Sequence, residues 1–366
     1  MENKIVLALN SEKDNPRNSE GAFITLPDGR ILFAYTRFAG NNWNDDARAD
    51  IAARYSEDGG DTWSDTDRIL VRNEGQCNVM SVSLLRLQDR FLRLFYLRKN
   101  HAQDCRPYMR KMKENGEIGD ETVLCIPDPG YFVVNNDRII QLTNGRLIIP
   151  AAFHRAVGKQ FQEEPDISHE IDIRGIAMFY LSDDQGKSWR AAKDWWAFPG
   201  KCASGLQEPG VMELKDGRIF AWCRTDAGGQ DELFSEDYGE TWSAPQPAWF
   251  KSPCSPLSIK RIPSTGDLLA IWNDSSLVRE RGLEPPQESS WGRTPLVSAI
   301  STDEGKTWSA SKIIESDPSH GYCYTAIHFA GDSVLLAYCC GGGKTAVLQD
   351  LCIRKISMDW LYSSGN

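Results

Sequence analysis

Two tyrosines and one glutamate are the residues of this chain whose types and spacing point most directly to chemistry. Counting back nine residues from each of six recurrent hairpin turns gives candidates for a central pocket: Glu20, Met80, Asn136, Glu208, Leu257 and Tyr322. Tyr324 points to the same face of its expected strand as Tyr322 and is an alternative to it. Such a ring of carboxylate, amide and phenol side chains is unusual for a merely structural axis.

The elements that must position these residues are indicated by a repeated turn. The motif Ser-x-Asp-x-Gly-x-Ser/Thr-Trp begins at four positions, which are Ser56, Ser182, Ser235 and Ser301. Its Asp and Ser side chains can accept hydrogen bonds from nearby backbone N–H groups, and its Gly supplies a positive φ. The Trp offers a large apolar face for a neighbouring element to cover. The motif therefore predicts a series of tight β-hairpins.

A second repeat consists of hairpin turns between alternating apolar runs, around Gly29, Asp89, Gly145, Gly217, Gly266 and Gly331. The two repeats interleave, so that each unit of about sixty residues holds four strands. The sequence predicts an all-β fold, a six-bladed β-propeller of four-stranded antiparallel blades in one domain over residues 1–366. The blades are expected near 15–70, 75–130, 133–196, 205–250, 254–315 and 320–366, with the N-terminal strand 3–9 closing the ring.

The interleaving also predicts where a pocket can lie. In an up-and-down blade, the turns from first to second and from third to fourth strand share one face of the disc. The Asp-containing turns are therefore expected to be structural, and the pocket should lie on the opposite face. The long polar loops 37–50, 152–175 and 273–293 are expected there. The acidic stretch of the second loop, around Glu163, Glu164 and Asp166, is interpreted as a rim or lid, with an ordinary solvated loop as the alternative.

Composition excludes several classes of partner. A net charge of −10 argues against nucleic acid or an anionic membrane surface, and no apolar stretch reaches the roughly 18 residues of a membrane span. The N-terminus lacks a secretory signal, which favours a cytoplasmic protein. Ten cysteines without CxxC pairs are expected mostly as buried thiols, and five histidines without ligand spacing predict no metal. No cofactor is expected, and the sequence does not indicate an oligomeric state.

The repeated turn and the segments around Glu208 and the two tyrosines resemble the sialidase (neuraminidase) superfamily, in which the turn is called the Asp box. The resemblance implies a glycoside hydrolase that releases a terminal acidic sugar from a glycan through a Tyr nucleophile, a Glu base and an Asp acid/base. It gives the Glu role to Glu208 and the nucleophile's role to Tyr322 or Tyr324. It gives the acid/base role to Asp45, with Asp46 as the alternative. Because such an acid must hold its proton, we expect partial burial to raise its pKa.

Members of this superfamily also bind the sugar carboxylate with three arginines. The first expected position here holds Ser19, with Arg17 two residues away, and the second, six residues after Arg224, holds Gln230. Only Arg293 matches, so that the set of arginines at these positions is incomplete. Either an arginine from another loop, Arg17, Arg37, Arg48 or Arg138, substitutes, or the substrate is a different sugar. The full set of predicted substrate-binding residues is Arg17, Glu20, Arg37, Asn136, Arg138, Arg224, Gln230 and Arg293.

Two alternatives to a sialic acid hydrolase therefore stay open. One is a glycosidase for a different sugar on the same scaffold, and the other is a non-catalytic carbohydrate-binding propeller. A carboxylate beside a phenol favours an enzyme, because a binding module has no need of a base there.

Overall fold

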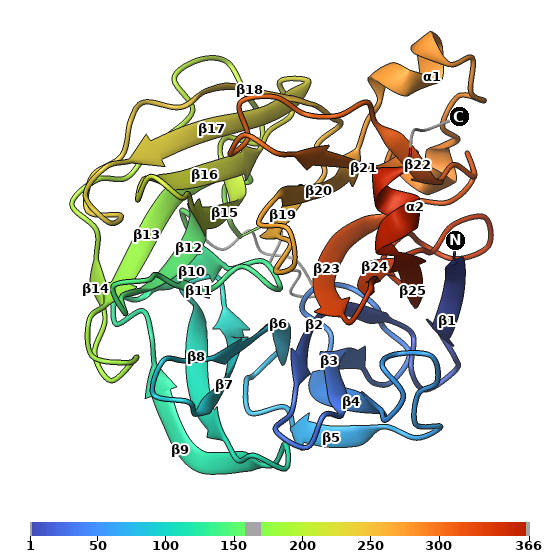
Figure 1. Ribbon diagram of the computed structural model, residues 1–366. Coiled ribbons are helices and arrows are strands. Elements are labelled where there is room, and N and C mark those ends of the chain that lie inside the picture. Colours follow the sequence, from blue (N-terminus) through green and yellow to red (C-terminus); the bar gives the residue numbers. More distant parts are fainter. Residues whose placement is uncertain (1, 158–169, 364–366) are drawn as a thin grey trace.

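The structure, a computed structural model, describes residues 2–157 and 170–363 of the chain. Over these residues the chain forms six antiparallel four-stranded units around a common axis, and the strands β2, β6, β15, β19 and β23 lie nearest that axis (Figure 1). This arrangement confirms the predicted fold class, an all-β propeller. Of the loop 152–175, the residues 158–169, with Glu163, Glu164 and Asp166, lie outside the described residues.

The strands follow one another as predicted from the interleaved repeats. Blade one contains β2 (Asn18–Thr25), β3 (Ile31–Phe38), β4 (Ala49–Ser56) and β5 (Arg68–Val71). Blade two contains β6 (Asn78–Arg86), β7 (Leu92–His101), β8 (Asp104–Met112) and β9 (Ile118–Leu124). Blade three contains β11 (Ile140–Gln141), β12 (Leu147–His154), β13 (Ile176–Ser182) and β14 (Arg190–Ala191).

Blade four contains β15 (Gln207–Glu213), β16 (Ile219–Arg224), β17 (Gly229–Ser235) and β18 (Gln246–Lys251). Blade five contains β19 (Ser258–Arg261), β20 (Leu268–Asn273), β21 (Leu296–Ser301) and β22 (Lys312–Glu315). Blade six contains β23 (Cys323–Ala330), β24 (Ser333–Cys339) and β25 (Leu351–Ser357), and its fourth strand is β1 (Asn3–Leu9) from the other end of the chain. The N-terminal strand pairs antiparallel with β25, so the first and the last strand of the chain lie side by side (Figure 1).

Blades two and three are joined by a short extra strand, β10 (Gly130–Val133). It runs parallel to β8 and antiparallel to β12, which merges the two blades into one nine-stranded sheet. No sequence repeat announced this strand, because it lies in the linker between two blades. It brings Tyr131 to the wall of a cavity described below.

The core lies between successive blades. The second strand of each blade is buried along almost its whole length, as in β3 (ILFAYTRF) and β20 (LLAIWN), because a neighbouring sheet covers each of its faces. Leu32 and Ala34 of blade one, for example, share one apolar cluster with Val82 and Leu94 of blade two. This packing between neighbouring blades holds the sheets together as one ring.

The Asp-containing turns form the hydrogen bonds that their sequence predicts. Ser56 Oγ donates to Asp58 Oδ1 (2.9 Å) and accepts from the Gly60 N–H (2.8 Å). Thr62 donates its N–H to Oδ1 (2.9 Å) and its hydroxyl to Oδ2 (2.6 Å) of the same Asp58. The same set recurs around Asp184, Asp237 and Asp303.

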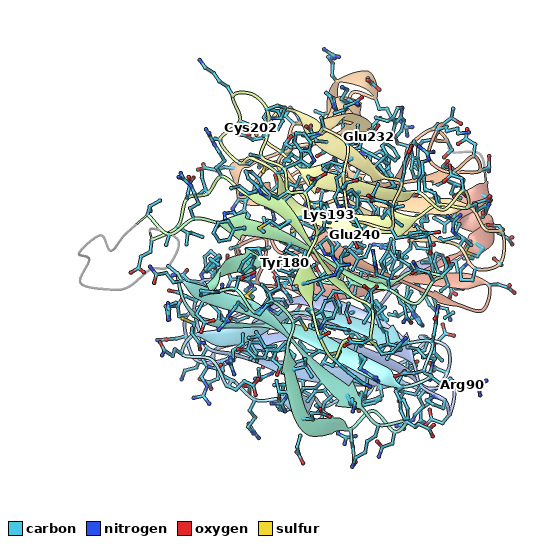
Figure 2. All side chains as sticks on the ribbon, turned by 90° about the vertical axis from the view of Figure 1, so that its left-hand side faces the viewer. Arg90, Tyr180, Lys193, Cys202, Glu232 and Glu240 are labelled. Atoms are coloured by element: carbon cyan, nitrogen blue, oxygen red, sulfur yellow. The ribbon has the colours of Figure 1, made fainter. Side chains whose placement is uncertain are left out.

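The two faces of the disc differ in what they carry. The view from the edge in Figure 2 places Arg90, in the hairpin turn between β6 and β7, toward one side and Cys202, in the linker between β14 and β15, toward the other.

The helices of the described residues are short. The loop between β20 and β21 holds a short helix, α1 (Ser276–Glu280), and a 3-10 turn, η2 (Glu288–Ser290). The chain then ends with α2 (Met358–Tyr362). Among the described residues, no helix is long and apolar enough to cross a membrane.

Candidate active site

A cavity of about 420 Å³ opens at the axis, on the face that carries the linkers and long loops. Its wall is unusually rich in ionisable side chains of both signs. They are Arg17, Glu20, Asp45, Asp46, Lys99, His154, Glu208, Arg224, Arg293 and Tyr324. Apolar side chains such as Met80 and Leu97 cover one side of it. The cavity lies away from the Asp-containing turns, as the interleaved repeats predict.

Backbone bulges at the start of the innermost strands aim side chains into this cavity. The β15–β16 register shifts between Gln207 and Gly210, and Glu208 within the shift has φ 46°. The β23–β24 register shifts likewise between Cys323 and Ala326, where Tyr324 has φ 59°. Positive φ is uncommon for residues other than glycine and costs about 1–3 kcal/mol, so its recurrence indicates a conformation maintained by the surrounding fold. Equivalent positions in other blades are Glu20, Ser81 and Asp137, with φ of 54°, 57° and 57°.

Glu208 and Tyr324 meet inside the cavity. The Tyr324 hydroxyl donates to Glu208 Oε1 at 3.0 Å, and Arg224 Nη1 lies 2.9 Å from both carboxylate oxygens. The same Nη1 donates to the Tyr324 hydroxyl at 3.3 Å. Burial raises the pKa of Tyr324 well above its usual value, and the charge of Glu208 adds to this effect. The phenol therefore keeps its proton, with a proton acceptor already in hydrogen-bond contact.

Tyr322, the other predicted nucleophile, does not reach the cavity. It is buried in an apolar cluster of blades five and six, edge-on to Tyr338 with ring centroids 6.1 Å apart. The count of nine residues fails here because the hairpin after β23 is short, with Ala330 paired directly to Ser333. In blade one, Thr25 pairs with Ile31, so more residues separate the strand from Gly29. The shorter turn moves the bulge from position 322 to Tyr324.

Asp45 lies at the cavity mouth in contact with Arg17, whose Nη1 donates to Asp45 Oδ1 at 2.6 Å. The cavity wall desolvates the carboxyl group and thereby favours its neutral form, but the charges of Arg17 and Lys99 outweigh this and lower the pKa of Asp45 to about 2. Our expectation of a raised pKa is therefore wrong for the empty cavity. The alternative residue, Asp46, also lines the cavity.

The described residues bring three guanidinium groups to the cavity, those of Arg17, Arg224 and Arg293. The expected positions hold Ser19 and Gln230, and the guanidinium groups of Arg17, which was one of the possible substitutes, and of Arg224 reach the cavity instead. Arg17 lies just before β2, stacks on the Phe38 ring at 4.5 Å and donates its Nε–H to Ser19 Oγ at 3.1 Å. Arg224 on β16 is paired in register with Gln230 on β17, so the neighbouring strand supplies the side chain expected at 230.

The other predicted binding residues separate into two groups. Glu20 lines the cavity and accepts from Arg17 Nη2 (3.3 Å) and Ser81 Oγ (2.6 Å). Four others lie outside the cavity wall: Arg37, Asn136, Arg138 and Gln230. Their side chains have partners elsewhere.

Those four side chains serve the scaffold. Arg37 pairs with Asp67 at 3.0 Å, and Gln230 donates to Ser255 O at 2.8 Å. Asn136 donates to the backbone oxygens of Gly21 (2.7 Å) and Tyr324 (3.1 Å), which links the innermost strands. Arg138 is buried, lies over the Trp222 ring and lines a second cavity. Arg37 and Arg138 were candidates for their charge, Asn136 from the count of nine residues, and Gln230 from the expected arginine position.

Lys99 and Ser81 are site residues that the sequence did not indicate. Lys99 comes from β7, is buried, and donates its Nζ to the backbone oxygen of Asp45 at 2.6 Å. Ser81 is the positive-φ residue of blade two, one position after the predicted Met80. An aromatic residue, Trp291, also lines the cavity, and the Arg293 guanidinium lies 5.6 Å from the centre of the Trp291 ring.

In residues 2–157 and 170–363, no group of three or more His, Cys, Asp or Glu side chains could hold a metal ion.

Comparison with known proteins places this site in context. The sequence model of the BNR repeat-like domain matches residues 84–336, and no curated protein matches the sequence. A Dyadobacter fermentans protein of unknown function has the same fold, with a TM-score of 0.71 and 16% identity over 97% of this chain and 99% of its own.

Two enzymes of known structure are similar to the same extent. The leech intramolecular trans-sialidase gives a TM-score of 0.69 at 14% identity, over 99% of this chain and 71% of its own. The Trypanosoma rangeli sialidase gives 0.70 at 14% identity, over 98% of this chain, which spans only 59% of that protein. Identities this low show a shared fold alone. The match over residues 84–336 shows that the chain belongs to the BNR repeat-like domain family, and it shares its β-propeller fold with these sialidases.

Proposed function

We propose that this protein is an exo-acting glycoside hydrolase that releases a terminal sialic acid, or a closely similar acidic sugar, from a glycan. The observation that carries the proposal is the 3.0 Å hydrogen bond from the Tyr324 hydroxyl to Glu208, made in a cavity that also holds three arginines. A carbohydrate-binding module needs no base in contact with a buried phenol. The cavity volume of about 420 Å³ is within the usual range for a small-molecule site.

The proposed reaction has two steps. In the first, Glu208 accepts the phenol proton while Tyr324 Oη bonds to the anomeric carbon, the glycosidic bond breaks, and Asp45 gives its proton to the leaving oxygen. In the second, Asp45 takes a proton from a water molecule that attacks the anomeric carbon, and Tyr324 leaves with the proton returned by Glu208. Two displacements at one carbon retain its configuration. A tyrosine suits this task in place of a carboxylate because a neutral nucleophile does not repel an anionic sugar.

The arginines would bind the sugar carboxylate. Arg224 and Arg293 lie on either side of Tyr324: Arg224 Nη1 touches its hydroxyl, and the Arg293 guanidinium lies over its ring, 5.6 Å from the centre. Arg17 reaches the cavity from the blade-one side. Guanidinium groups form strong, directional bonds to carboxylates, which would fix the anomeric carbon above Tyr324.

The direct test is release of the fluorophore from a fluorogenic sialoside. We expect turnover by the wild-type protein and a loss of about a thousandfold in Glu208→Gln, which keeps the shape of the side chain but removes the base. No turnover across sialosides of several linkages would reject the sialic acid assignment. Turnover of another glycoside that Glu208→Gln abolishes would then identify the alternative, a glycosidase for a different sugar.

A further inference from the structure

Arg17 and Asp45 form an ion pair whose two members differ greatly in freedom. The Arg17 side chain is 1% exposed and held by Ser19, Glu20 and the Trp43 carbonyl. The Asp45 side chain is 66% exposed, and its carboxylate has Arg17 as its sole hydrogen-bond partner among the described residues. Arg17 is therefore a fixed part of the cavity wall, whereas the carboxylate of Asp45 can leave it by rotation of one side chain.

The backbone of Asp45 would stay in place during such a rotation. Its carbonyl oxygen accepts from Lys99 Nζ at 2.6 Å and from Asn78 Nδ2 at 2.7 Å. Asn78 also donates to the Ala47 carbonyl at 2.9 Å, which ties down the same loop. The movement is thus confined to the carboxymethyl group, and the loop needs no rearrangement.

The ion pair conflicts with the role proposed for Asp45. A general acid must carry a proton, but a carboxylate bonded to a guanidinium is ionised. The pKa of Asp45 in the empty cavity is indeed lowered to about 2 against the desolvating effect of the cavity wall, chiefly by Arg17 and also by Lys99 and Arg293. Glu20, the remaining acidic partner of Arg17, is buried and bonded to Ser81. When an anion binds to Arg17, the carboxylate of Asp45 is consequently the group that moves away.

We propose that Asp45 occupies the carboxylate position at Arg17 before a ligand binds, and that the substrate carboxylate displaces it. Once displaced, Asp45 becomes protonated. Two changes act in the same direction. Asp45 loses its guanidinium partner, and a new negative charge arrives beside it, so that the displaced carboxyl group takes up a proton from solvent. The acid of the first step is then formed only when a carboxylate-bearing ligand is bound. This inference rests on the proposed function.

The experiment measures proton uptake on binding of DANA, a carboxylate-bearing sialic acid analogue that inhibits the Trypanosoma rangeli sialidase. Calorimetric titrations in pairs of buffers with different ionisation enthalpies, from pH 8 to pH 4.5, give the number of protons bound per ligand. We expect no uptake at pH 8 and uptake that grows toward one proton as the pH falls. In Asp45→Asn the uptake should disappear, and DANA should bind about tenfold more tightly at pH 7 because its competitor at Arg17 is gone.

Two matched variants separate Asp45 from its neighbours. Asp46→Asn removes the adjacent cavity carboxylate, and Glu20→Gln removes the other carboxylate that contacts Arg17. Both should keep most of the wild-type proton uptake. Uptake that survives in Asp45→Asn, or DANA binding that becomes weaker in that variant, would overturn the inference while leaving the proposed function intact. If DANA and a panel of sialosides bind to neither protein, the proposed function fails and this inference with it.

Discussion

Two aspartates on opposite faces of the propeller, Asp58 and Asp45, are ionised for different reasons. The pKa of each is lowered to about 2. At Asp58 the cause is hydrogen bonding from Thr62, Ser56 and Asp61, all within its own turn. At Asp45 the cause is the charge of Arg17, which is 28 positions away in sequence and supplied by another element. The hydrogen bonds to Asp58 all come from its own turn. The ionisation of Asp45 depends chiefly on Arg17, a partner to which a ligand can bind instead.

The same contrast holds for the two faces as a whole. The Ser–Asp hydrogen bond of the Asp-containing turn measures 2.9 Å in all four copies, because eight consecutive residues suffice to build it. The cavity has no repeated unit: Glu208 comes from blade four, Tyr324 from blade six and Asp45 from blade one. What repeats in this protein is the support, and what differs between blades is the chemistry.

The largest effect should follow from removing the phenol of the cavity. If the proposed function holds, we expect Tyr324→Phe to lower kcat/KM on the glycoside that is cleaved by about 10³- to 10⁴-fold, because the proposed nucleophile is removed. The matched control is Tyr322→Phe, the same substitution two residues away in the apolar cluster, which should change kcat/KM by less than about twofold. Equal losses in both variants would mean that the register of β23 differs from the one described here.

A smaller and selective effect is expected at Asp45. Asp45→Asn should slow release of an alcohol leaving group, such as that of a natural glycan, by about 10²- to 10³-fold, because the oxygen leaves unprotonated. A fluorogenic aryl leaving group needs little protonation and should lose less than about tenfold in the first step. The measurement is single-turnover kinetics on both substrates. Equal losses on the two would show that Asp45 does not act as the acid.

On the other face, loss of the turn carboxylate should affect stability alone. Asp58→Ala removes the acceptor of the Thr62 N–H and hydroxyl and should lower the free energy of unfolding by about 1 kcal/mol. Urea denaturation followed by tryptophan fluorescence measures this. The folded variant should keep the wild-type kcat, because Asp58 is on the face away from the cavity. A selective loss of kcat would contradict the assignment of the two faces.

The contrast also explains how far the sequence could predict this molecule. The turns and the six-bladed fold followed from short local motifs, and so did Glu208, which precedes a hairpin of standard length. The fixed count of nine residues points to Tyr322 and misses Tyr324, because the turn at Gly331 is shorter than the turn in blade one. The positions of Lys99 and of the three arginines in the cavity depend on strand register and on side-chain orientation. No local pattern in one sequence encodes either.

The smallest effect is a pH dependence at the turns. The pKa of Asp58 is lowered from its ordinary 3.8 to about 2, so its ionised form stabilises the folded state fully above pH 4, and this contribution disappears as the pH falls toward 2. Solvent screening at this exposed site limits it to about 0.5 kcal/mol. The difference in unfolding free energy between wild type and Asp58→Asn should therefore be smaller at pH 2.5 than at pH 6 in urea titrations. An unchanged difference would show that the amide replaces the carboxylate in every hydrogen bond, and that the turn depends on geometry and not on charge.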